Sequence, residues 1–233
     1  MCLADAILIT RPEPGAGDTA FRVAALGFEP LLAPVFTIEP VPARLPSAVA
    51  AVLATSGNAL APCFPACRLL PLYTVGDATA ARARAMGFGR VVSASGDAVA
   101  LAALAIRDLR PADGTLLLAS GRGQGMPLAT TLRQAGFRVL RRAVYRAVPS
   151  RALPDAAVDA LRAGTVRAAL FFSAATARTF VRLIQNACLG ETVRSVEALA
   201  IGAAAGVALQ GLPWRRVGVA AKPTQDAMLA LLR

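Results

Sequence analysis

The 233-residue sequence contains no histidine. Catalytic pairs of serine or cysteine with histidine are therefore excluded, and so is the side chain that most often acts as a general base. The same absence bears on metal binding, because the cysteines match no common zinc spacing and no histidine is present to complete one. We expect reduced thiols that are structural or incidental, and no metal site. The cysteines are Cys2, Cys63, Cys67 and Cys188.

Long hydrophobic runs are also missing. The longest apolar run, Ala198 to Leu209, is well below the roughly 20 residues that a membrane-spanning helix needs. The start of the chain carries Asp5 and no basic lead-in, which is not the pattern of a signal peptide. With 56% hydrophobic and 17% charged residues, the composition is that of a globular protein. We expect a soluble cytoplasmic protein with no membrane partner.

Lysine is almost absent, since 24 of the 25 basic residues are arginine and Lys222 is the other. The formal net charge of +11 is compatible with a solvated arginine-rich surface, an anionic membrane surface, an acidic small molecule or nucleic acid. The arginines are scattered along the chain and aromatic residues make up only 5%. A solvated surface is therefore the first interpretation, a polyanionic ligand the second, and no nucleic-acid partner is expected.

The familiar nucleotide-binding motifs fail at individual residues. The glycine-rich segment Gly121–Pro127 (GRGQGMP) has Met126 where the dinucleotide fingerprint has its third glycine. The next apolar run, FRVLRR, does not end in an acidic residue. Lys222 is not in a phosphate-loop context, and no acidic cluster indicates a magnesium site. These departures exclude a Walker-type NTPase and argue against a dinucleotide enzyme.

The chain carries an internal duplication. An apolar run at Ile7–Arg11 (ILITR) leads through a helical stretch to AALGFEPLLAPVFTIEP, which ends at Pro40. A second run at Leu116–Arg122 (LLLASGR) leads likewise to RQAGFRVLRRAVYRAVP, which ends at Pro149. Each copy predicts a strand, a helix, a second strand and an extended segment closed by proline. The equivalent positions are Gly27 and Gly136, Phe36 and Tyr145, and Pro40 and Pro149.

A second block also occurs twice, so the order along the chain is A, B, A′, B′. In each copy, short apolar runs stop at small or polar residues that open a helical pattern. This alternation predicts parallel sheets with helices on their faces. The proline-flanked segments that close the A blocks are the predicted linkers. The similar segments are Ala50–Leu60 and Arg167–Ala177, Leu72–Phe88 and Leu199–Leu212, and Ala94–Leu104 and Ala221–Leu232.

Small and polar residues mark the predicted strand-to-helix junctions. Helix N-termini leave backbone N–H groups unpaired and carry partial positive charge, so they suit carboxylates or phosphates. In open parallel sheets, ligands bind beyond the carboxyl ends of the strands. Helix capping explains any single junction, whereas six of them in two matching halves favour a shared anion-binding cleft. They are Thr55–Asn58, Gly76–Thr79, Gly121–Gly123, Ser173–Ala174, Gly202–Ala203 and Pro223–Thr224.

Taken in order, these short motifs resemble the uroporphyrinogen-III synthase family, whose members close and rearrange hydroxymethylbilane in tetrapyrrole (haem) biosynthesis. The resemblance covers nearly the whole chain. Each motif is short, and their order and spacing together are more specific than any one of them. The motifs are ITRP (Ile9–Pro12), LATSGNAL, TVGDATA, LLLASGRG, VYRAVP, FFSAATA, AIGAAAG and KPTQDAM.

The resemblance implies two α/β domains with Rossmann- or flavodoxin-like parallel sheets, joined by a two-stranded linker. The first domain would be discontinuous, formed by residues 1–34 and 150–233. The second, residues 41–143, would be inserted between linkers at about 35–40 and 144–149. The resemblance also implies a substrate cleft between the domains, no metal or organic cofactor, and a monomeric lyase. Its partners would be a linear tetrapyrrole polycarboxylate and, transiently, the preceding enzyme of the pathway.

The resemblance also implies functional residues. Tyr145 matches the family's recurrent tyrosine on the second connector, whose hydroxyl would assist departure of the substrate's terminal hydroxyl. A phenol with a reference pKa of about 10 is protonated at neutral pH and can donate a proton. From the residues alone, packing as a strand residue is the favoured explanation of Tyr145. The implied substrate-binding residues are Arg11, Ser56, Gly57, Thr79, Gly121, Arg122, Ser173, Gly202, Ala204, Pro223 and Thr224.

Departures from the family pattern support an alternative function. The family often has paired threonines where this chain has Ala204 and Ala205. Its glycine-rich loop often carries basic residues where this chain has Ser120 and Gly125. The alternative is a catalytically silent relative that binds a tetrapyrrole or another polyanion as a sensor or accessory module. The sequence contains no DNA-binding motif through which a sensor could act, which argues against this alternative.

Overall fold

The computed structural model describes residues 5–44, 46 and 48–232. The chain divides into two units, each with its own sheet. The first unit contains the residues up to Thr37 together with those from Val148 onwards, and the second runs from Ile38 to Ala147. The first unit is therefore built from two separate stretches of sequence, with the second unit inserted between them.

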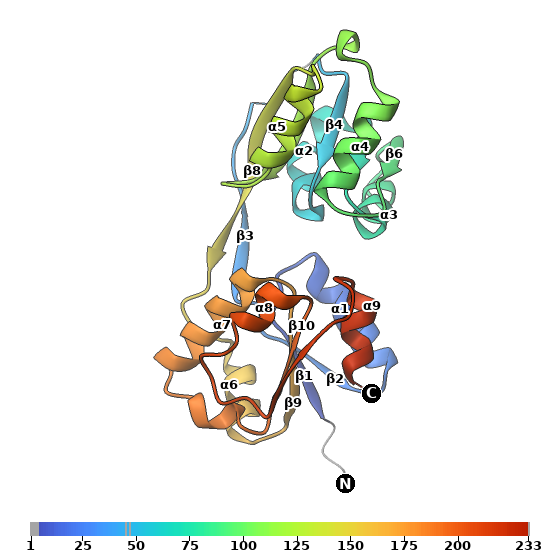
Figure 1. Cartoon of the computed structure of the whole chain (residues 1–233). Coiled ribbons are helices and arrows are strands. Elements are labelled where there is room, and N and C mark those ends of the chain that lie inside the picture. Colours follow the sequence, from blue (N-terminus) through green and yellow to red (C-terminus); the bar gives the residue numbers. More distant parts are fainter. Residues whose placement is uncertain (1–4, 45, 47, 233) are drawn as a thin grey trace. The chain divides into compact units, whose positions relative to one another are not determined.

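The first unit is a five-stranded sheet with helices on both faces (Figure 1). Its strand order is β11-β10-β9-β1-β2, and every neighbouring pair is parallel. Its elements are β1 (Ala6–Ile9), α1 (Gly15–Ala25), β2 (Glu29–Leu32), α6 (Asp155–Arg162), β9 (Val166–Phe171), α7 (Ala174–Asn186), η3 (Gly190–Val193), β10 (Glu197–Ala200), α8 (Ala203–Val207), β11 (Arg216–Val219), α9 (Gln225–Leu229) and η4 (Ala230–Leu232).

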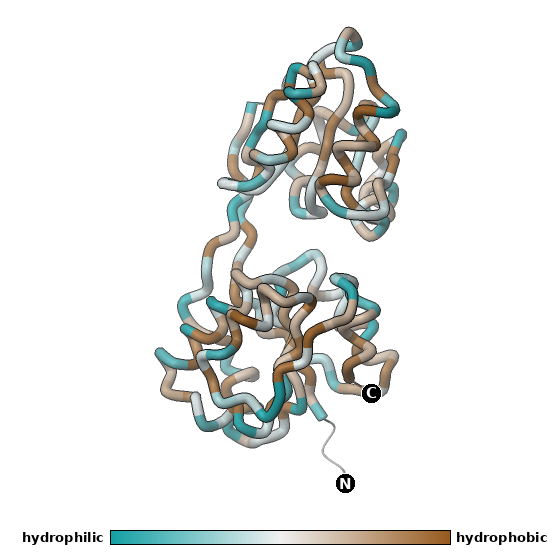
Figure 2. The backbone as a smooth tube through the Cα atoms, in the orientation of Figure 1, coloured by the Kyte–Doolittle hydropathy of each residue, from teal (hydrophilic) through white to brown (hydrophobic). Residues whose placement is uncertain are grey.

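The central strands of this unit are short apolar runs that are buried on both faces, which is typical of parallel sheets. All four residues of β1 are buried. Helices α1 and α9 cover one face, where Val23 and Met228 pack with Ile9. Helices α6, α7 and α8 cover the other face, where the ring centroids of Phe171 and Phe180 are 5.2 Å apart. Figure 2 shows the hydrophobic positions concentrated along such interior strands.

The second unit is a six-stranded sheet in the order β3-β8-β7-β4-β5-β6. The pairs from β8 to β6 are all parallel. Its elements are β3 (Phe36–Pro40), β4 (Ala51–Ala54), η1 (Gly57–Ala59), α2 (Leu60–Cys67), β5 (Pro71–Thr74), α3 (Asp77–Ala85), β6 (Arg90–Ser93), α4 (Ala98–Asp108), η2 (Pro111–Asp113), β7 (Leu116–Gly121), α5 (Met126–Gln134) and β8 (Val139–Pro149).

Alternate residues of the central strands in the second unit face two separate hydrophobic cores. Val52 and Leu117 belong to the core beneath α2 and α3, whereas Leu53 and Leu118 belong to the core beneath α4 and α5. The division follows from the two-residue period of a strand, which sends neighbouring side chains to opposite faces. Both sheets are therefore covered by helices on both sides, and the expected α/β fold class with parallel sheets is confirmed.

In the interior of each sheet, the helices that follow two neighbouring strands go to opposite faces; the same change occurs at one edge, between β10 and β11 and between β5 and β6. In the first unit these strands are β1 and β9, followed by α1 and α7. In the second unit they are β7 and β4, followed by α5 and α2. Ligands of open α/β sheets bind at such switch points, beyond the carboxyl ends of the strands. The predicted junctions at these switch points are therefore the favoured positions for a ligand.

The two segments that join the units form neighbouring strands, β3 and β8. The N–H of Val41 donates to the carbonyl oxygen of Val144, and the N–H of Ser150 donates to that of Val35, both at 2.9 Å. As the residue number rises along β3, the number of its partner in β8 falls, so the two strands are antiparallel. The segments predicted as linkers, 35–40 and 144–149, lie within or next to this pair.

Among the residues that the structure describes, no helix is both long enough and apolar enough to cross a membrane.

Candidate active site

Arg11 lies at the switch point of the first unit. It follows β1, and its guanidinium carbon lies 4.3 Å from the ring centroid of Phe172, which follows the neighbouring strand β9. Its Nη1 donates to Oε1 of Gln225 at 3.3 Å. Burial lowers the pKa of the Arg11 guanidinium, and the nearby carboxylates of Asp18 and Glu13 oppose this effect. The side chain therefore provides a positive charge that is partly shielded from water.

Ser173 lies directly after Phe172, at the N-cap of α7. Its hydroxyl oxygen accepts a hydrogen bond from the N–H of Thr176 at 3.1 Å. The first-turn N–H groups of Ala174 and Ala175 have no intrahelical acceptor, as at the start of any α-helix. Because α7 has 13 residues and no acidic residue in its first turn, its positive end is available to an anion. Arg11 and Ser173 thus come to the same edge of one sheet.

Ser56 and Gly57 follow β4 at the switch point of the second unit. Ser56 has an extended backbone and caps the 3₁₀ turn η1, where its Oγ accepts from the N–H of Asn58 at 3.2 Å. The turn leads directly into α2, and its first turn contains no acidic residue. This helix end is therefore electrostatically open to a carboxylate.

Gly121 and Arg122 follow the other switch-point strand, β7. Gly121 is buried at the end of the strand, and Arg122 is exposed in the turn before α5. Gly123 and Gly125 both have left-handed backbones, with φ of +76° and +80°. Residues other than glycine rarely adopt this conformation, which explains why the turn is glycine-rich without a nucleotide fingerprint.

Tyr145 reaches this turn because of a β-bulge between β7 and β8. Ser120 pairs with Ala143, but Gly121 pairs with Tyr145, so Val144 is an extra residue. A regular strand would send Val144 and Tyr145 to opposite faces. Here both belong to the same hydrophobic core, at 0% and 3% exposure. The bulge therefore turns the phenol towards the carboxyl ends of β7 and β4.

The hydroxyl of Tyr145 lies in a polar cluster at the edge of this core. It donates to Oε1 of Gln124 at 3.1 Å. Burial raises the pKa of the phenol above its usual value, and hydrogen bonds from the Ser56 side chain, the Gly121 backbone and the Asn58 side chain partly oppose this. The phenol is therefore protonated at neutral pH, and the structure brings together Tyr145, Ser56 and Gly121.

Thr79 lies in a different electrostatic setting. It is in the first turn of α3, where Asp77 already places a carboxylate at the positive end of the helix. Hydrogen bonds from the side chains of Ser93 and Ser95 lower the pKa of Asp77. A second carboxylate at this helix end would be repelled, so α3 is a less favourable anion site than α7.

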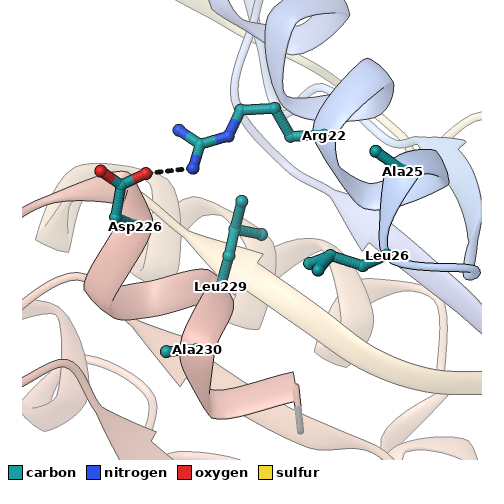
Figure 3. Close-up of a pocket in the computed structure, with 6 residues that line it drawn as sticks. All are labelled: Arg22, Ala25, Leu26, Asp226, Leu229 and Ala230. Atoms are coloured by element: carbon teal, nitrogen blue, oxygen red, sulfur yellow. Dashed lines mark hydrogen bonds and ion pairs between the residues drawn. The ribbon is translucent and has the colours of Figure 1, made fainter.

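Pro223 and Thr224 are exposed before α9, and Thr224 caps this helix by accepting from the N–H of Ala227 at 3.3 Å. The first turn contains Asp226, which forms an ion pair with Arg22 of α1 (Figure 3). The pair borders a hollow of about 370 Å³ whose other walls are apolar. This hollow contains none of the predicted site residues. The hollow is lined by Arg22, Ala25, Leu26, Asp226, Leu229 and Ala230.

Gly202 and Ala204 lie at the start of α8, after β10. Gly202 is the N-cap with an extended backbone, and a Cβ added to it would contact nothing within 4 Å. Ala204 is exposed, whereas Ala205, the second position at which the family often has threonine, is buried. α8 has only five residues, so its end is a weaker anion site than that of α7.

Sequence reasoning missed one side chain in the cluster around Tyr145. Gln124 lies within the glycine-rich segment but carries no charge and matches no motif, so nothing in the pattern singled it out. Asn58 was included in a predicted junction, without a role.

Within the described part of the chain, no three His, Cys, Asp or Glu side chains come together as a metal site. Cys63, Cys67 and Cys188 are free thiols. Cys2 lies outside the described residues.

Comparison with known families gives a match over residues 18–230 to the model described as uroporphyrinogen-III synthase HemD. The chain belongs to the uroporphyrinogen-III synthase family. This confirms the family that the motif order indicated. The match supports the uroporphyrinogen-III synthase function, and the catalytically silent alternative is not favoured. A comparison with curated proteins found no match.

Solved structures of uroporphyrinogen-III synthases are similar to this chain. The uroporphyrinogen-III synthetase of Helicobacter pylori 26695 is 17% identical, with a TM-score of 0.65 and 98% of each chain covered. A mutant uroporphyrinogen-III synthase of Thermus thermophilus is 22% identical, with a TM-score of 0.48 and 98% of this chain and 97% of that chain covered. The first likeness shows the fold.

Proposed function

We propose that the protein is a lyase that cyclises hydroxymethylbilane to uroporphyrinogen III, with loss of water and inversion of the terminal pyrrole ring. Membership of the family supports the activity. The neutral, buried phenol of Tyr145 at the carboxyl ends of β4 and β7 supplies the chemical group that the first step needs. A linear tetrapyrrole polycarboxylate is the substrate class.

In this proposal Tyr145 is the proton donor. The bond between the terminal methylene carbon and its hydroxyl oxygen breaks, with both electrons going to oxygen. The oxygen takes the phenol proton and leaves as water, which leaves a cationic azafulvene and a phenolate. Ring closure through a spiro intermediate then releases a proton from the attacked pyrrole, which restores the phenol. A phenol with a raised pKa remains protonated at neutral pH and is ready for the first step.

In this proposal, helix N-termini and arginines bind the substrate carboxylates. The open end of α7 at Ser173, the turn at Ser56 and Gly57, and the turn at Gly121 and Arg122 offer main-chain N–H groups. Arg11 adds a fixed guanidinium. The net charge of +11 attracts a polyanion over a longer range.

Selection of the inverted product is a matter of positioning in this proposal. The same precursor closes without inversion in the absence of an enzyme, so the protein must hold the chain in one conformation and keep water from the cation. Thr79, Gly202, Ala204, Pro223 and Thr224 remain predicted contacts of secondary weight, because their helices are short or already carry a carboxylate.

Separation of the product isomers tests the function directly. The purified protein is incubated with hydroxymethylbilane, and the two uroporphyrinogen isomers are resolved and timed against a protein-free control. We expect the inverted isomer to dominate and to form faster than the spontaneous product. Accumulation of the non-inverted isomer alone, at the spontaneous rate, would refute the proposal.

The proposal also includes a monomer in the cytoplasm that contacts the preceding pathway enzyme only transiently. Size-exclusion chromatography coupled to light scattering tests the first point. Comparison of the isomer ratio with and without the preceding enzyme tests the second, because direct transfer would leave less of the unstable precursor to close spontaneously.

A further inference from the structure

The side chain of Gln124 folds back over Gly121 to reach the catalytic phenol. Its Oε1 accepts the hydrogen bond of the Tyr145 hydroxyl at 3.1 Å. A Cβ added to Gly121 would lie 2.9 Å from that Oε1 and 2.9 Å from Cζ of Tyr145. The missing side chain at position 121 is therefore what allows the amide and the phenol to meet.

The backbone of Gln124 is held independently of its side chain. Its N–H donates to the carbonyl oxygen of Gly121 at 3.0 Å. Its own carbonyl oxygen accepts from Nη1 of Arg141 at 2.8 Å and from Oγ of Ser120 at 3.2 Å. Because these main-chain and side-chain groups fix the turn, a change of the Gln124 side chain is expected to leave the turn in place.

The amide oxygen interacts differently with the two forms of the phenol. Oε1 of Gln124 can only accept, so it stabilises the phenol while the proton is present and does nothing for the phenolate. The side chains of Ser56 and Asn58 act in the opposite sense, because their hydrogen bonds to the phenol favour the phenolate. Gln124 is exposed, so water can solvate its oxygen once the phenol turns to another acceptor.

We propose that Gln124 is a positioning residue that holds the Tyr145 hydroxyl with its proton in place until the leaving hydroxyl of the substrate accepts it. The inference rests on the proposed function for its kinetic consequence, but the contact itself is testable without substrate. An uncharged acceptor suits the role, because a carboxylate at position 124 would retain the phenol proton and repel a polyanionic substrate.

A phenol titration tests the contact. The chain has two tyrosines, so in a Tyr73→Phe background the near-ultraviolet absorbance of phenolate reports Tyr145 alone. We expect Gln124→Ala to lower the pKa of Tyr145, because the acceptor is lost and water is admitted. We expect Gln124→Glu to raise it, because a negative charge opposes ionisation. The residue Gln134, at the far end of α5, provides the control Gln134→Ala, which is expected to leave the titration unchanged.

Kinetics test the consequence. Gln124→Ala is expected to lower kcat about 3- to 10-fold, the factor that corresponds to one neutral hydrogen bond. KM is expected to change by less than about twofold, because in this proposal Gln124 does not bind substrate carboxylates. In a Tyr145→Phe background, Gln124→Ala is expected to cause no further loss, since both changes remove the same interaction.

The outcomes separate this inference from the proposed function. Identical Tyr145 titrations in the parent, Gln124→Ala and Gln124→Glu proteins overturn it, whatever the activity. An active enzyme in which Tyr145→Phe is slow and Gln124→Ala retains full kcat overturns it while the proposed function stands. If the protein forms no inverted isomer, the proposed function fails, and the titration still decides the contact. Should Gln124→Ala fail to fold, the near-isosteric Gln124→Glu decides the titration.

Discussion

Ser95 donates a hydrogen bond from its Oγ to Oδ1 of Asp77 at 2.9 Å, which holds a carboxylate at the start of α3. Ser95 itself has a left-handed backbone, with φ of +48°, and its N–H donates to Oγ of Ser93. The carboxylate of Asp77 thus occupies the positive end of α3, a position where a substrate carboxylate could otherwise bind.

The first prediction compares two helix ends. Thr79→Ala is expected to change KM by less than about twofold, because Asp77 already occupies the positive end of α3. Ser173→Ala is expected to raise KM more, because it weakens the open end of α7. Steady-state kinetics with hydroxymethylbilane measure both. Equal increases in the two variants would show that α3 binds substrate despite its carboxylate.

The second prediction concerns the phenol. Tyr145→Phe is expected to reduce kcat by about 10²-fold or more, as for loss of a general acid. The free energy of unfolding should fall by only about 1 kcal/mol, because the ring still packs and only the hydroxyl is lost. Turnover and denaturant unfolding are measured on the same preparation. Unaltered turnover would show that Tyr145 is not the proton donor and only packs in the core.

The third prediction concerns the close approach at Gly121. Gly121→Ala is expected to push Gln124 and Tyr145 apart, because the new Cβ would lie 2.9 Å from both. Overpacking of this kind costs about 1–3 kcal/mol, and kcat should fall with it. Gly202→Ala is the matched control, since a Cβ there contacts nothing within 4 Å and the backbone is extended. Equal stability of the two variants would contradict the packing described.

The fourth prediction separates main-chain from side-chain binding. Ala174→Pro removes one N–H from the first position of α7, where proline is well tolerated and where Ser173 already has the extended backbone that proline requires. KM is expected to rise roughly tenfold, as for a lost hydrogen bond to a charged group. Ala174→Ser keeps the N–H and should behave as the parent. A normal KM for Ala174→Pro would exclude this N–H as a carboxylate ligand.

The fifth prediction concerns pH. With no histidine in the chain and the pKa of Tyr145 above its usual value of about 10, kcat is expected to be flat between about pH 6 and pH 9. The unfolded chain releases the phenol proton at about pH 10, before the folded chain does, so ionisation above this pH favours unfolding. Stability should therefore decrease from about pH 10 upwards. An inflection in kcat near neutrality would indicate another titrating group.

Much of the fold could be predicted from the sequence, because the repeated alternation of apolar runs and helical patterns is local information. The small residues at the strand ends were visible for the same reason. What could not be predicted are relationships set by strand pairing and tertiary contact. No residue type indicates the bulge at Val144, and the contact of Asp77 with Ser95 joins the start of α3 to the loop after β6. Gln124 was hidden because its position depends on left-handed glycines on either side.

The extra residue in β8 determines which face of the sheet the phenol of Tyr145 lies on. If the same residues paired regularly with β7, Val144 would lie opposite Gly121 and Tyr145 would turn to the other face of the sheet, with every side chain still present. A strand with one residue fewer before Tyr145 and no bulge would also leave Tyr145 opposite Gly121, so the number of residues in β8 and its pairing together set the face of the phenol.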